Sequence, residues 1–278
     1  MKILDGRIIK EQILNELKDN VDRLNIKPSF VVIQVGNNEV SNIYIRQKAK
    51  MAEYVGYNFY LEKFDEDISE DALIKEIERL NNDSMINGIL VQMPLPDHID
   101  ASRVQNAVVP LKDIDGLHDL NAGLLFHKKN TLFPCTPLGV MELLKRYNIS
   151  LSGVDTVVVG RSNLVGKPMS MMLTNADATV TLCHSKTKNL GEITRKADLL
   201  VVAVGSPKLI KADMVKDGAV VIDIGVNRVD NVTCGDVDFD NVKEKVSCIT
   251  PVPGGVGQMT VAMLAHNVLE AYKMQKGN

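Results

Sequence analysis

The segment 41–55 contains the residues best suited to proton transfer, because it places a lysine one helical turn after a tyrosine. At about 100° per residue, a helix here presents a largely apolar stripe that Lys48 interrupts. The stripe consists of Ser41, Tyr44, Lys48, Met51 and Val55, and the opposite face carries Arg46, Lys50 and Glu53. A lysine beside a buried face can have a lowered pKa and exchange protons near neutral pH. The alternative is a lysine that reaches solvent from the rim of the core.

Two further polar residues follow in the first half of the chain. Gln92 comes directly after the apolar run 89–91, which is typical of a buried parallel strand. Open α/β sheets bind ligands at the carboxyl ends of their strands, so an amide there could orient a lysine amine. A capping or turn glutamine is the alternative. Asp115 lies in Lys112-Asp113-Ile114-Asp115-Gly116, which by itself predicts only a turn.

A glycine-containing loop follows the strand predicted over 156–159. The sequence Gly160-Arg161-Ser162-Asn163-Leu164-Val165-Gly166-Lys167-Pro168 leads into a helix whose first turn accommodates the proline. The N–H groups and positive dipole at a helix N-terminus suit a phosphate group. The loop matches the Gly-x-Gly-x-x-Gly fingerprint only in part, so it fits a dinucleotide site and also an ordinary strand-to-helix turn.

The residues after the next predicted strand, 179–183, favour NADP over NAD. Many NAD-binding folds place an acidic residue there, which bonds the ribose 2′-hydroxyl. This chain has His184-Ser185-Lys186 instead, and Arg161 lies on the preceding loop. Basic and hydroxyl groups suit a 2′-phosphate, although a solvated positive edge would have the same composition.

A second glycine-rich loop, Thr250-Pro251-Val252-Pro253-Gly254-Gly255-Val256-Gly257, precedes the last predicted helix. Its glycines let the backbone approach a ligand closely. A flexible hinge is the alternative, but the flanking prolines favour a loop of fixed shape.

The elements that position these residues alternate between helix and strand in two sets. The first set has helices over 7–24, 41–55 and 69–81, where Ser69 is the expected N-cap, and strands over 29–35, 57–64 and 89–91. Residues 110–136 are rich in Gly, Asn and Pro and are predicted to be a connector. The second set has helices over 138–147, 167–174 and 258–275, strands over 156–159, 179–183, 199–204 and 219–224, and a less regular region, 225–248, with room for a hairpin. This pattern predicts two α/β domains with a cleft between them.

Composition excludes several classes of protein. The 278 residues suffice for two modest domains, and the net charge of −3 gives no electrostatic basis for binding nucleic acid or an anionic membrane. No apolar run approaches the roughly 20 residues of a membrane span, and the first residues do not resemble a signal peptide. Four scattered cysteines and five unclustered histidines predict neither a disulfide framework nor a metal site. A reducing cytoplasm is therefore the expected compartment.

Together, these segments resemble the methylenetetrahydrofolate dehydrogenase/cyclohydrolase family over nearly the whole chain. The matching segments are long and occur in the family's order. They are SNIYIRQKAK (41–50), GILVQMPLP (88–96), KDIDGLH (112–118), PCTPLGV (134–140), VVVGRSNLVGKPMS (157–170), CHSKT (183–187), VIDIGVN (221–227), GDVDF (235–239) and TPVPGGVGQMTVAML (250–264).

The resemblance implies an N-terminal α/β folate-binding catalytic domain over 1–120, joined by the helix 258–278, and a C-terminal Rossmann-like NADP-binding domain over 138–250. It implies oxidation of 5,10-methylenetetrahydrofolate with NADP⁺ and hydrolysis of the product to 10-formyltetrahydrofolate. The tetrahydrofolate substrate would bind in the cleft, and two chains would form a homodimer through the cofactor domain.

The resemblance also implies roles for individual residues. Lys48 matches the essential lysine, Gln92 the partner that keeps it in a useful protonation state, Tyr44 a residue lining the folate site, and Asp115 the group that holds the pterin ring. The positions expected to contact cofactor are Gly160, Arg161, Ser162, Ser185 and Val226. Those expected near folate or nicotinamide are Gly254 and Gly255. The chain departs from the family at Gln258, where proline is usual, which is expected to affect the start of the last helix.

Three rival functions are a dehydrogenase without cyclohydrolase activity, a two-domain NADP dehydrogenase acting on a hydroxy or amino acid, and a non-catalytic nucleotide-binding module. The presence of Lys48 and Gln92 argues against the first. The combination of Tyr44, Lys48, Gln92 and the KDIDG segment disfavours the second. The third predicts the loss of at least one of Tyr44, Lys48, Gln92 and Asp115, and all four are present.

Overall fold

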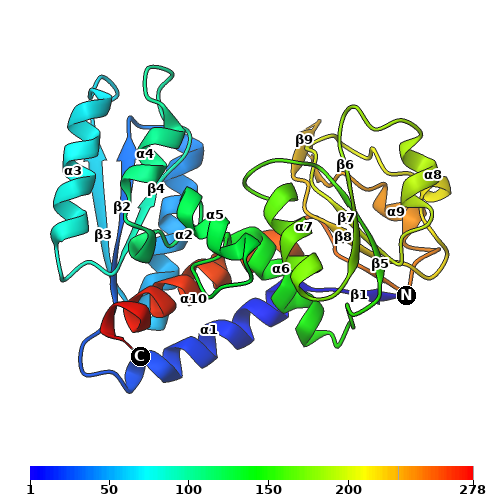
Figure 1. Ribbon diagram of the computed structural model, residues 1–278, viewed down its shortest axis with the longest axis horizontal. Helices are drawn as coiled ribbons and strands as arrows, with labels where there is room; N and C mark the ends of the chain where they lie inside the picture. Colours follow the sequence, from blue (N-terminus) through cyan, green and yellow to red (C-terminus); the bar gives the residue numbers. More distant parts are fainter. Residues whose placement is uncertain (231, 278) are drawn as a thin grey trace. The chain divides into compact units, whose positions relative to one another are not determined.

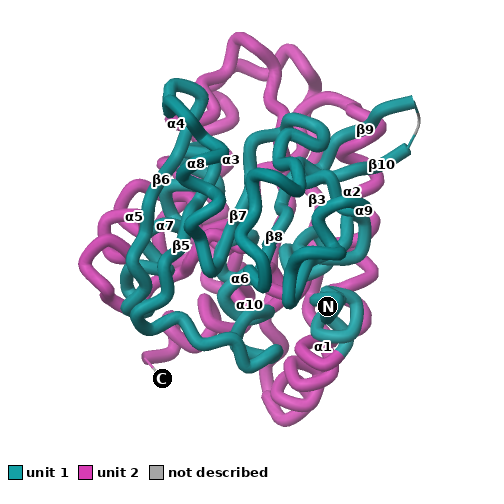
Figure 2. Tube along the Cα trace, turned by 90° about the vertical axis from the view of Figure 1, so that its right-hand side faces the viewer, with its two compact units in different colours: residues 1–11, 136–260 teal, residues 12–135, 261–278 magenta. Residues whose placement is uncertain are grey.

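The computed structural model describes residues 1–230 and 232–277 (Figure 1). The chain forms two compact units, each built on its own parallel sheet (Figure 2). Unit 1 comprises Met1–Glu11 and Thr136–Thr260, and unit 2 comprises Gln12–Cys135 and Val261–Asn278. The α/β class predicted from the alternating pattern is confirmed.

Unit 2 contains a three-stranded parallel sheet in the order β3-β2-β4. Its strands are β2 (Ser29–Val35), β3 (Asn58–Phe64) and β4 (Gly88–Val91). Every residue of β2 and β4 is buried, as their continuous apolar runs predict, whereas the edge strand β3 has exposed positions. The chain passes from β2 to β3 on one side and then to β4 on the other. The carboxyl ends of β2 and β4 therefore form a topological switch point.

Helices connect and cover these strands (Figure 1). They are α1 (Gly6–Asp22), α2 (Glu39–Val55), α3 (Glu70–Asn82), α4 (Ala101–Ala107), the 3₁₀ helix η1 (Pro110–Lys112) and α5 (Asp119–Phe126). Ser69 caps α3 as predicted, because its hydroxyl oxygen accepts a hydrogen bond from the Ala72 N–H at 3.3 Å. Leu73 and Ile77 of α3 pack with Ile33 and Ile89 in the core on one face of the sheet.

The region 110–136, which the sequence predicts to be a connector, contains helical elements that the pattern did not indicate. This region contains η1 and α5, and α4 ends just before it. Side-chain contacts organise it: the Asp113 carboxylate accepts hydrogen bonds from the His118 N–H and from Asn121 Nδ2, both at 2.8 Å. Such contacts produce no apolar periodicity in the sequence, so the pattern could not indicate these short helices.

Unit 1 contains a six-stranded parallel sheet in the order β1-β11-β8-β7-β5-β6. Its strands are β1 (Lys2–Ile3), β5 (Asp155–Val159), β6 (Thr179–Cys183), β7 (Leu199–Val202), β8 (Val220–Asp223) and β11 (Cys248–Ile249). The edge strand β1 was not predicted, and it brings the N-terminal segment of the chain into this unit. The chain leaves β5 for β6 on one side and returns to β7 on the other, so the carboxyl ends of β5 and β7 form a second switch point.

The remaining elements of unit 1 include long helices and short pieces that the sequence pattern missed. They are α6 (Cys135–Arg146), α7 (Gly166–Asn175), α8 (Leu190–Thr194), η2 (Ala212–Met214), α9 (Phe239–Val242), β9 (Asn227–Val229) and β10 (Val232–Cys234). The last helix, α10 (Val256–Lys276), begins in unit 1 and continues from Val261 in unit 2. The antiparallel pair β9–β10 confirms a hairpin within 225–248. On one face of the large sheet, Leu200 and Val221 pack with Val215 and Val242.

Candidate active site

Lys48 and Gln92 form a close polar contact in unit 2. Lys48 Nζ donates a hydrogen bond to Gln92 Oε1 at 2.6 Å. Helix α2, which follows β2, carries the lysine, and Gln92 directly follows β4. The two side chains therefore meet beside the switch point of the smaller sheet, where an amide was expected to orient a lysine amine.

The Gln92 side chain is held in one orientation. Its Nε2 donates to the Met93 carbonyl oxygen at 2.7 Å, and its backbone N–H donates to the Ile33 carbonyl oxygen at 2.8 Å. Because the amide nitrogen is already bonded, Oε1 is the atom that faces Lys48. A neutral carbonyl oxygen orients the amine without the full negative charge that would strongly favour its protonated form.

Lys48 is coupled electrostatically to Asp115 and Cys135. Burial lowers the pKa of Lys48, and the negative charge of Asp115 opposes this change. Burial raises the pKa of Asp115, and the positive charge of Lys48 opposes it in turn. Burial also raises the pKa of the Cys135 thiol, which donates to the Ile114 carbonyl oxygen at 3.4 Å. The structure thus brings Lys48, Gln92 and Asp115 together, in surroundings that shift proton affinities toward neutrality.

The two charged neighbours of Asp115 in the sequence have structural roles. Lys112 is only 7% exposed, and its Nζ binds the end of α3. Its acceptors are the carbonyl oxygens of Leu80, Asn81 and Asp83, at 3.1, 2.8 and 2.7 Å. Asp113 holds the start of α5 and accepts from the Gly116 N–H at 3.1 Å. Of the three charged residues in KDIDG, Asp115 is therefore the one whose side chain is available for a role in the active site.

Tyr44 does not share the buried face of α2, so its assignment to the apolar stripe is wrong. Its side chain is 50% exposed, whereas Met51 and Val55 are buried. The buried face passes through Ile45 and Ala52 instead, one position further along the helix. Tyr44 therefore flanks the stripe one turn before Lys48 and presents its ring to solvent, where a flat ligand can reach it.

In unit 1, two glycines shape the loop after β5. Gly160 has a φ of 123°, and a Cβ there would lie 2.1 Å from the Ala203 carbonyl oxygen. A Cβ on Gly166 would lie 1.9 Å from the Gly160 carbonyl oxygen. Ser162 Oγ closes the turn by accepting from the Val165 N–H at 3.1 Å. The backbone is therefore compact at the second switch point, directly before the N-terminus of α7.

The side chains expected to contact a cofactor lie on turns at this edge of the large sheet. Arg161 and Ser162 are exposed after β5, Ser185 is exposed after β6, and Val226 is 65% exposed after β8. His184 fixes the turn after β6, where its N–H donates to Thr187 Oγ1 at 2.9 Å. A glycine-shaped loop with guanidinium and hydroxyl donors, and no acidic residue directly after β6, fits a dinucleotide with a 2′-phosphate.

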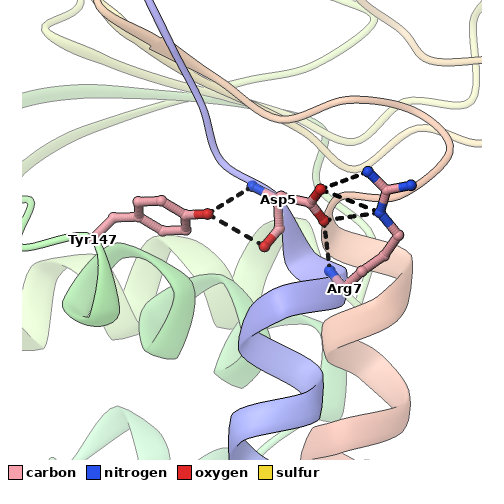
Figure 3. A network of polar contacts seen from close by, with 3 residues as sticks. All are labelled: Asp5, Arg7 and Tyr147. Carbon is pink, nitrogen blue, oxygen red and sulfur yellow. Dashed lines mark hydrogen bonds and ion pairs between the residues drawn. The ribbon is translucent and has the colours of Figure 1, made fainter.

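The N-terminal segment braces the second glycine loop. The Gly6 N–H donates to the Gly254 carbonyl oxygen at 2.9 Å, and a Cβ on Gly6 would lie 2.1 Å from the Gly255 carbonyl oxygen. Beside Gly6, the Asp5 carboxylate accepts from the Arg7 N–H at 2.9 Å and from its guanidinium at 2.5 Å (Figure 3). Arg7 lowers the pKa of Asp5 through these hydrogen bonds. These contacts favour a loop of fixed shape over a hinge.

Two side chains anchor the ends of this braced segment. The hydroxyl of Tyr147, in the turn directly after α6, accepts from the Asp5 N–H at 2.9 Å (Figure 3). Gln258, in the first turn of α10, accepts from Lys10 Nζ at 3.2 Å, and its backbone N–H donates to Gly255 at 3.1 Å. A proline at position 258 could form neither bond, so glutamine adds two polar contacts at the start of α10.

Sequence patterns missed two residues that border the candidate site of unit 2. Cys135 is coupled to Asp115, and Asn267 on α10 donates to the carbonyl oxygens of Ile114 and Phe133 at 2.9 and 2.8 Å. No spacing rule joins positions so far apart in the chain. The only signal was that both lie in or near segments that resemble the family.

Across residues 1–230 and 232–277, no group of three or more His, Cys, Asp or Glu side chains is arranged to hold a metal ion. No helix within these ranges is long and apolar enough to cross a membrane.

The large parallel sheet with its glycine loop, and the smaller α/β unit with its lysine–glutamine pair, together define a two-domain NAD(P)-dependent enzyme. Residues 134–276 match "Tetrahydrofolate dehydrogenase/cyclohydrolase, NAD(P)-binding domain", and residues 4–115 match the catalytic domain of the same family. The chain therefore belongs to the tetrahydrofolate dehydrogenase/cyclohydrolase family, and the resemblance read from its segments is confirmed.

Individual relatives agree with this assignment. The chain is 51% identical over 275 residues to "Bifunctional protein FolD" of Agathobacter rectalis, which covers 98% of this chain and 99% of the relative. The crystal structure of the bifunctional enzyme FolD from Campylobacter jejuni has a TM-score of 0.97 and 46% identity, with 99% of both chains covered. The Trypanosoma brucei methylenetetrahydrofolate dehydrogenase-cyclohydrolase, solved with NADP cofactor and an inhibitor, has a TM-score of 0.93 and 36% identity, with 99% of this chain and 98% of that chain covered.

Proposed function

We propose that this chain catalyses both reactions of its family. It oxidises 5,10-methylenetetrahydrofolate to 5,10-methenyltetrahydrofolate with NADP⁺, and it hydrolyses that product to 10-formyltetrahydrofolate. Bifunctional relatives about half identical over nearly the whole chain support this function. The observation that carries it is the 2.6 Å hydrogen bond from Lys48 Nζ to Gln92 Oε1, which equips the folate domain for proton transfer.

The two reactions call on two domains. The folate-binding domain spans 1–120 together with 258–278, and the NADP-binding domain spans 138–250. In the latter, Gly160, Arg161, Ser162, Ser185 and Val226 bind the cofactor, with Arg161 and Ser185 suited to its 2′-phosphate. Bound NADP⁺ supplies the hydride acceptor. The protein's contribution to this step is alignment, because the two nitrogens flanking the one-carbon bridge stabilise the product cation.

Hydrolysis requires protons to move to and from the folate, and Lys48 moves them. Water adds to the carbon between the two ring nitrogens, and the uncharged Lys48 amine accepts the proton that the water releases. The resulting ammonium returns a proton to the ring nitrogen that departs as the carbon–nitrogen bond breaks. The second proton of the water, on the hydroxyl of the adduct, is released to solvent as the formyl C=O forms. Burial favours the uncharged amine at the start, and Gln92 orients it, so this exchange works near neutral pH.

The remaining candidate residues hold the substrate. Asp115 binds the polar edge of the pterin ring, and its carboxyl also balances the charge that forms on Lys48. The half-exposed ring of Tyr44 stacks on or positions the folate. Gly254 and Gly255 allow the backbone of their loop to approach folate or nicotinamide closely.

The proposal extends to the quaternary structure and the compartment. The enzyme is a homodimer formed through the NADP-binding domain, whose hairpin exposes Val229 and Val232. All four cysteines are free, which supports a reducing cytoplasm as the compartment. The net charge of −3 supports a protein that binds no nucleic acid. Light scattering coupled to gel filtration tests the dimer, and a mass of 30.6 kDa would contradict it.

Replacement of Lys48 tests the hydrolytic role directly. The Lys48→Met variant should lose cyclohydrolase activity by about 10²–10⁴-fold, because a general acid–base group typically contributes that factor. Binding of NADP, measured by calorimetry, should not change. The control is Lys50→Met, which removes an exposed lysine from the same helix and should keep full activity. Hydrolysis that survives in Lys48→Met would sink the assignment.

A coupled assay separates the bifunctional enzyme from its rivals. Purified protein is mixed with 5,10-methylenetetrahydrofolate and either NADP⁺ or NAD⁺, and the reduced cofactor and methenyl product are followed by absorbance. Reduced cofactor without lasting methenyl accumulation, preferentially with NADP⁺, is the expected result. Methenyl that accumulates in step with reduced cofactor would indicate a dehydrogenase alone, and no reaction would favour a binding module.

A further inference from the structure

Two buried carboxylates lie at the carboxyl ends of β7 and β8, outside the set of residues assigned above. Asp223 ends β8 and is 3% exposed, and Asp236, which follows β10, is fully buried. An ionised side chain is costly to bury unless hydrogen bonds compensate for the lost water. What each carboxylate binds therefore indicates why it is there.

Asp236 ties together two loops at the edge of the large sheet. Its Oδ2 accepts from the N–H groups of Val204 and Gly205 at 2.7 and 3.0 Å. Its Oδ1 accepts from the Ser206 N–H at 2.8 Å and from Asn227 Nδ2 at 2.9 Å. Three of these donors belong to the loop after β7, and the fourth lies just beyond β8. One carboxylate thus fixes both loops.

Asp223 holds Asp236 in place from the other side. Its carboxylate accepts from the backbone N–H of Asp236 at 3.0 Å, of Val237 at 2.9 Å and of Gly225 at 3.0 Å. The packing is reciprocal: a Cβ on Gly225 would lie 2.1 Å from Asp236 Cγ, and a Cβ on Gly235 would lie 1.9 Å from Asp223 Oδ2. Each glycine makes room for the opposite carboxylate, which leaves no space for a longer side chain.

The two tied loops border the region where the cofactor is proposed to bind. The first loop starts after Ala203, whose carbonyl oxygen packs directly against Gly160 of the glycine loop. The second contains Val226, which is 65% exposed between Gly225 and Asn227. Asp236 does not face solvent itself, yet both backbone segments that it fixes lie at the carboxyl edge of the sheet, where such folds bind dinucleotides.

We propose that Asp236 is a positioning residue for NADP, which sets the backbone of residues 204–206 and of Val226 in the conformation that the cofactor requires. The inference rests on the proposed function. A carboxylate is required because all four partners are N–H donors, and its two oxygens accept from two of them each. An asparagine would turn an NH₂ group toward one pair of donors, so that pair would lose its acceptor and the loop would move.

The two activities of the enzyme give this proposal an internal control. Hydrolysis of methenyltetrahydrofolate at Lys48 needs no cofactor, so it reports on folding and on the folate site alone. In Asp236→Asn, we expect the Kd for NADP by calorimetry and the KM for NADP to rise at least tenfold, with cyclohydrolase turnover within twofold of the parent. The matched control is Asp240→Asn, an exposed carboxylate on α9 that should leave both properties unchanged.

A milder variant covers the case in which Asp236→Asn does not fold. Asn227→Ala removes one donor of the four, and Asn227 is only partly buried. It should raise the Kd for NADP several-fold and leave cyclohydrolase activity intact. An unchanged Kd in whichever variant keeps its cyclohydrolase activity would overturn the proposal. If the parent enzyme itself did not bind NADP, the proposed function would fail instead, so the two failures are distinguishable.

Discussion

The amine of Lys48 must accept and return a proton, and its surroundings balance its charged and uncharged forms. Burial favours the uncharged form, Asp115 favours the charged form, and the neutral Gln92 fixes the direction of the nitrogen. The identity of residue 92 is therefore critical, because glutamine and glutamate have similar shapes but opposite effects on a neighbouring ammonium. A carboxylate in contact with Lys48 would stabilise its protonated form, whereas the amide of Gln92 only orients the amine.

Gln92→Glu should therefore displace the cyclohydrolase pH profile toward alkaline pH. An opposite charge in direct contact typically raises the pKa of an amine by about 1–3 units, so activity should appear at correspondingly higher pH. The measurement is cyclohydrolase turnover across the pH range that the folate tolerates. The comparison is Gln92→Met, which lacks an acceptor and should lower turnover without an alkaline displacement. Identical midpoints in the two variants would show that residue 92 does not control the charge of Lys48.

Two of the three central site residues could be predicted from the sequence pattern, and the third could not. Lys48 and Gln92 could be found because one interrupts an apolar helix stripe and the other ends an apolar strand. Asp115 could not be separated from Asp113 by pattern alone, since both are acidic residues in one turn. The three-dimensional structure separates them, because Asp113 is bonded to the N–H of Gly116 and of His118, whereas Asp115 is coupled to Lys48.

At the scale of elements, helix α3 depends on a lysine from outside the helix. Lys112 reaches back from η1 to three carbonyl oxygens at the C-terminal end of α3, where backbone acceptors lack partners within the helix. The positive charge of Lys112 also interacts favourably with the negative end of the helix dipole. Although burial lowers the pKa of Lys112, the charge of Asp83 opposes this effect.

Lys112→Met should consequently destabilise the protein by about 3 kcal/mol, the cost of leaving buried carbonyl oxygens without a charged donor. Methionine has a similar length, so the loss reports on the hydrogen bonds more than on packing. Urea denaturation measures the change. Lys75→Met, an exposed substitution on α3 itself, is the control and should change stability by less than about 0.5 kcal/mol. Equal effects in both variants would mean that Lys112 does not support the helix.

Elements with a strong apolar period were predictable, and those fixed by side chains were not. The run SFVVIQV predicted β2 to the residue, and Ser69 marked the start of α3. Strand β1 was invisible because two residues carry no period, and it forms only because β11, far along the chain, offers a parallel edge. Helix α5 was missed because it is organised by backbone N–H groups that donate to the side chains of Asp113 and His118.

At the scale of the whole molecule, stability depends on how buried charges titrate. Asp223 is the clearest case in unit 1: burial raises its pKa to about 6 from an ordinary value of 3.8. The backbone N–H groups of Val237 and Asp236 oppose this rise, and the charge of Asp236 adds to it. The folded protein therefore holds a proton on Asp223 over a pH range in which the unfolded chain has already released it.

This difference fixes the sign of the pH dependence. Below pH 3.8 both states are protonated, and the stabilising contribution of the protonated Asp223 is fully present. As pH rises through about 6, the folded protein loses the proton and the contribution disappears, which amounts to roughly 3 kcal/mol in total. Asparagine does not titrate, so Asp223→Asn retains the effects of all other titrating groups. The difference between the parent and this variant therefore isolates the effect of Asp223.

We therefore expect the unfolding free energy of the parent, minus that of Asp223→Asn, to fall as pH rises from about 4 to about 7 and to stay constant above that. Urea denaturation at closely spaced pH values and fixed ionic strength measures both proteins. A difference that rises with pH would mean that the N–H donors around Asp223 outweigh its burial and hold its carboxylate ionised throughout. In that case Asp223 would stay ionised in the folded protein below pH 6 as well, because the backbone N–H groups of Gly225, Asp236 and Val237 would compensate for the burial of its charge.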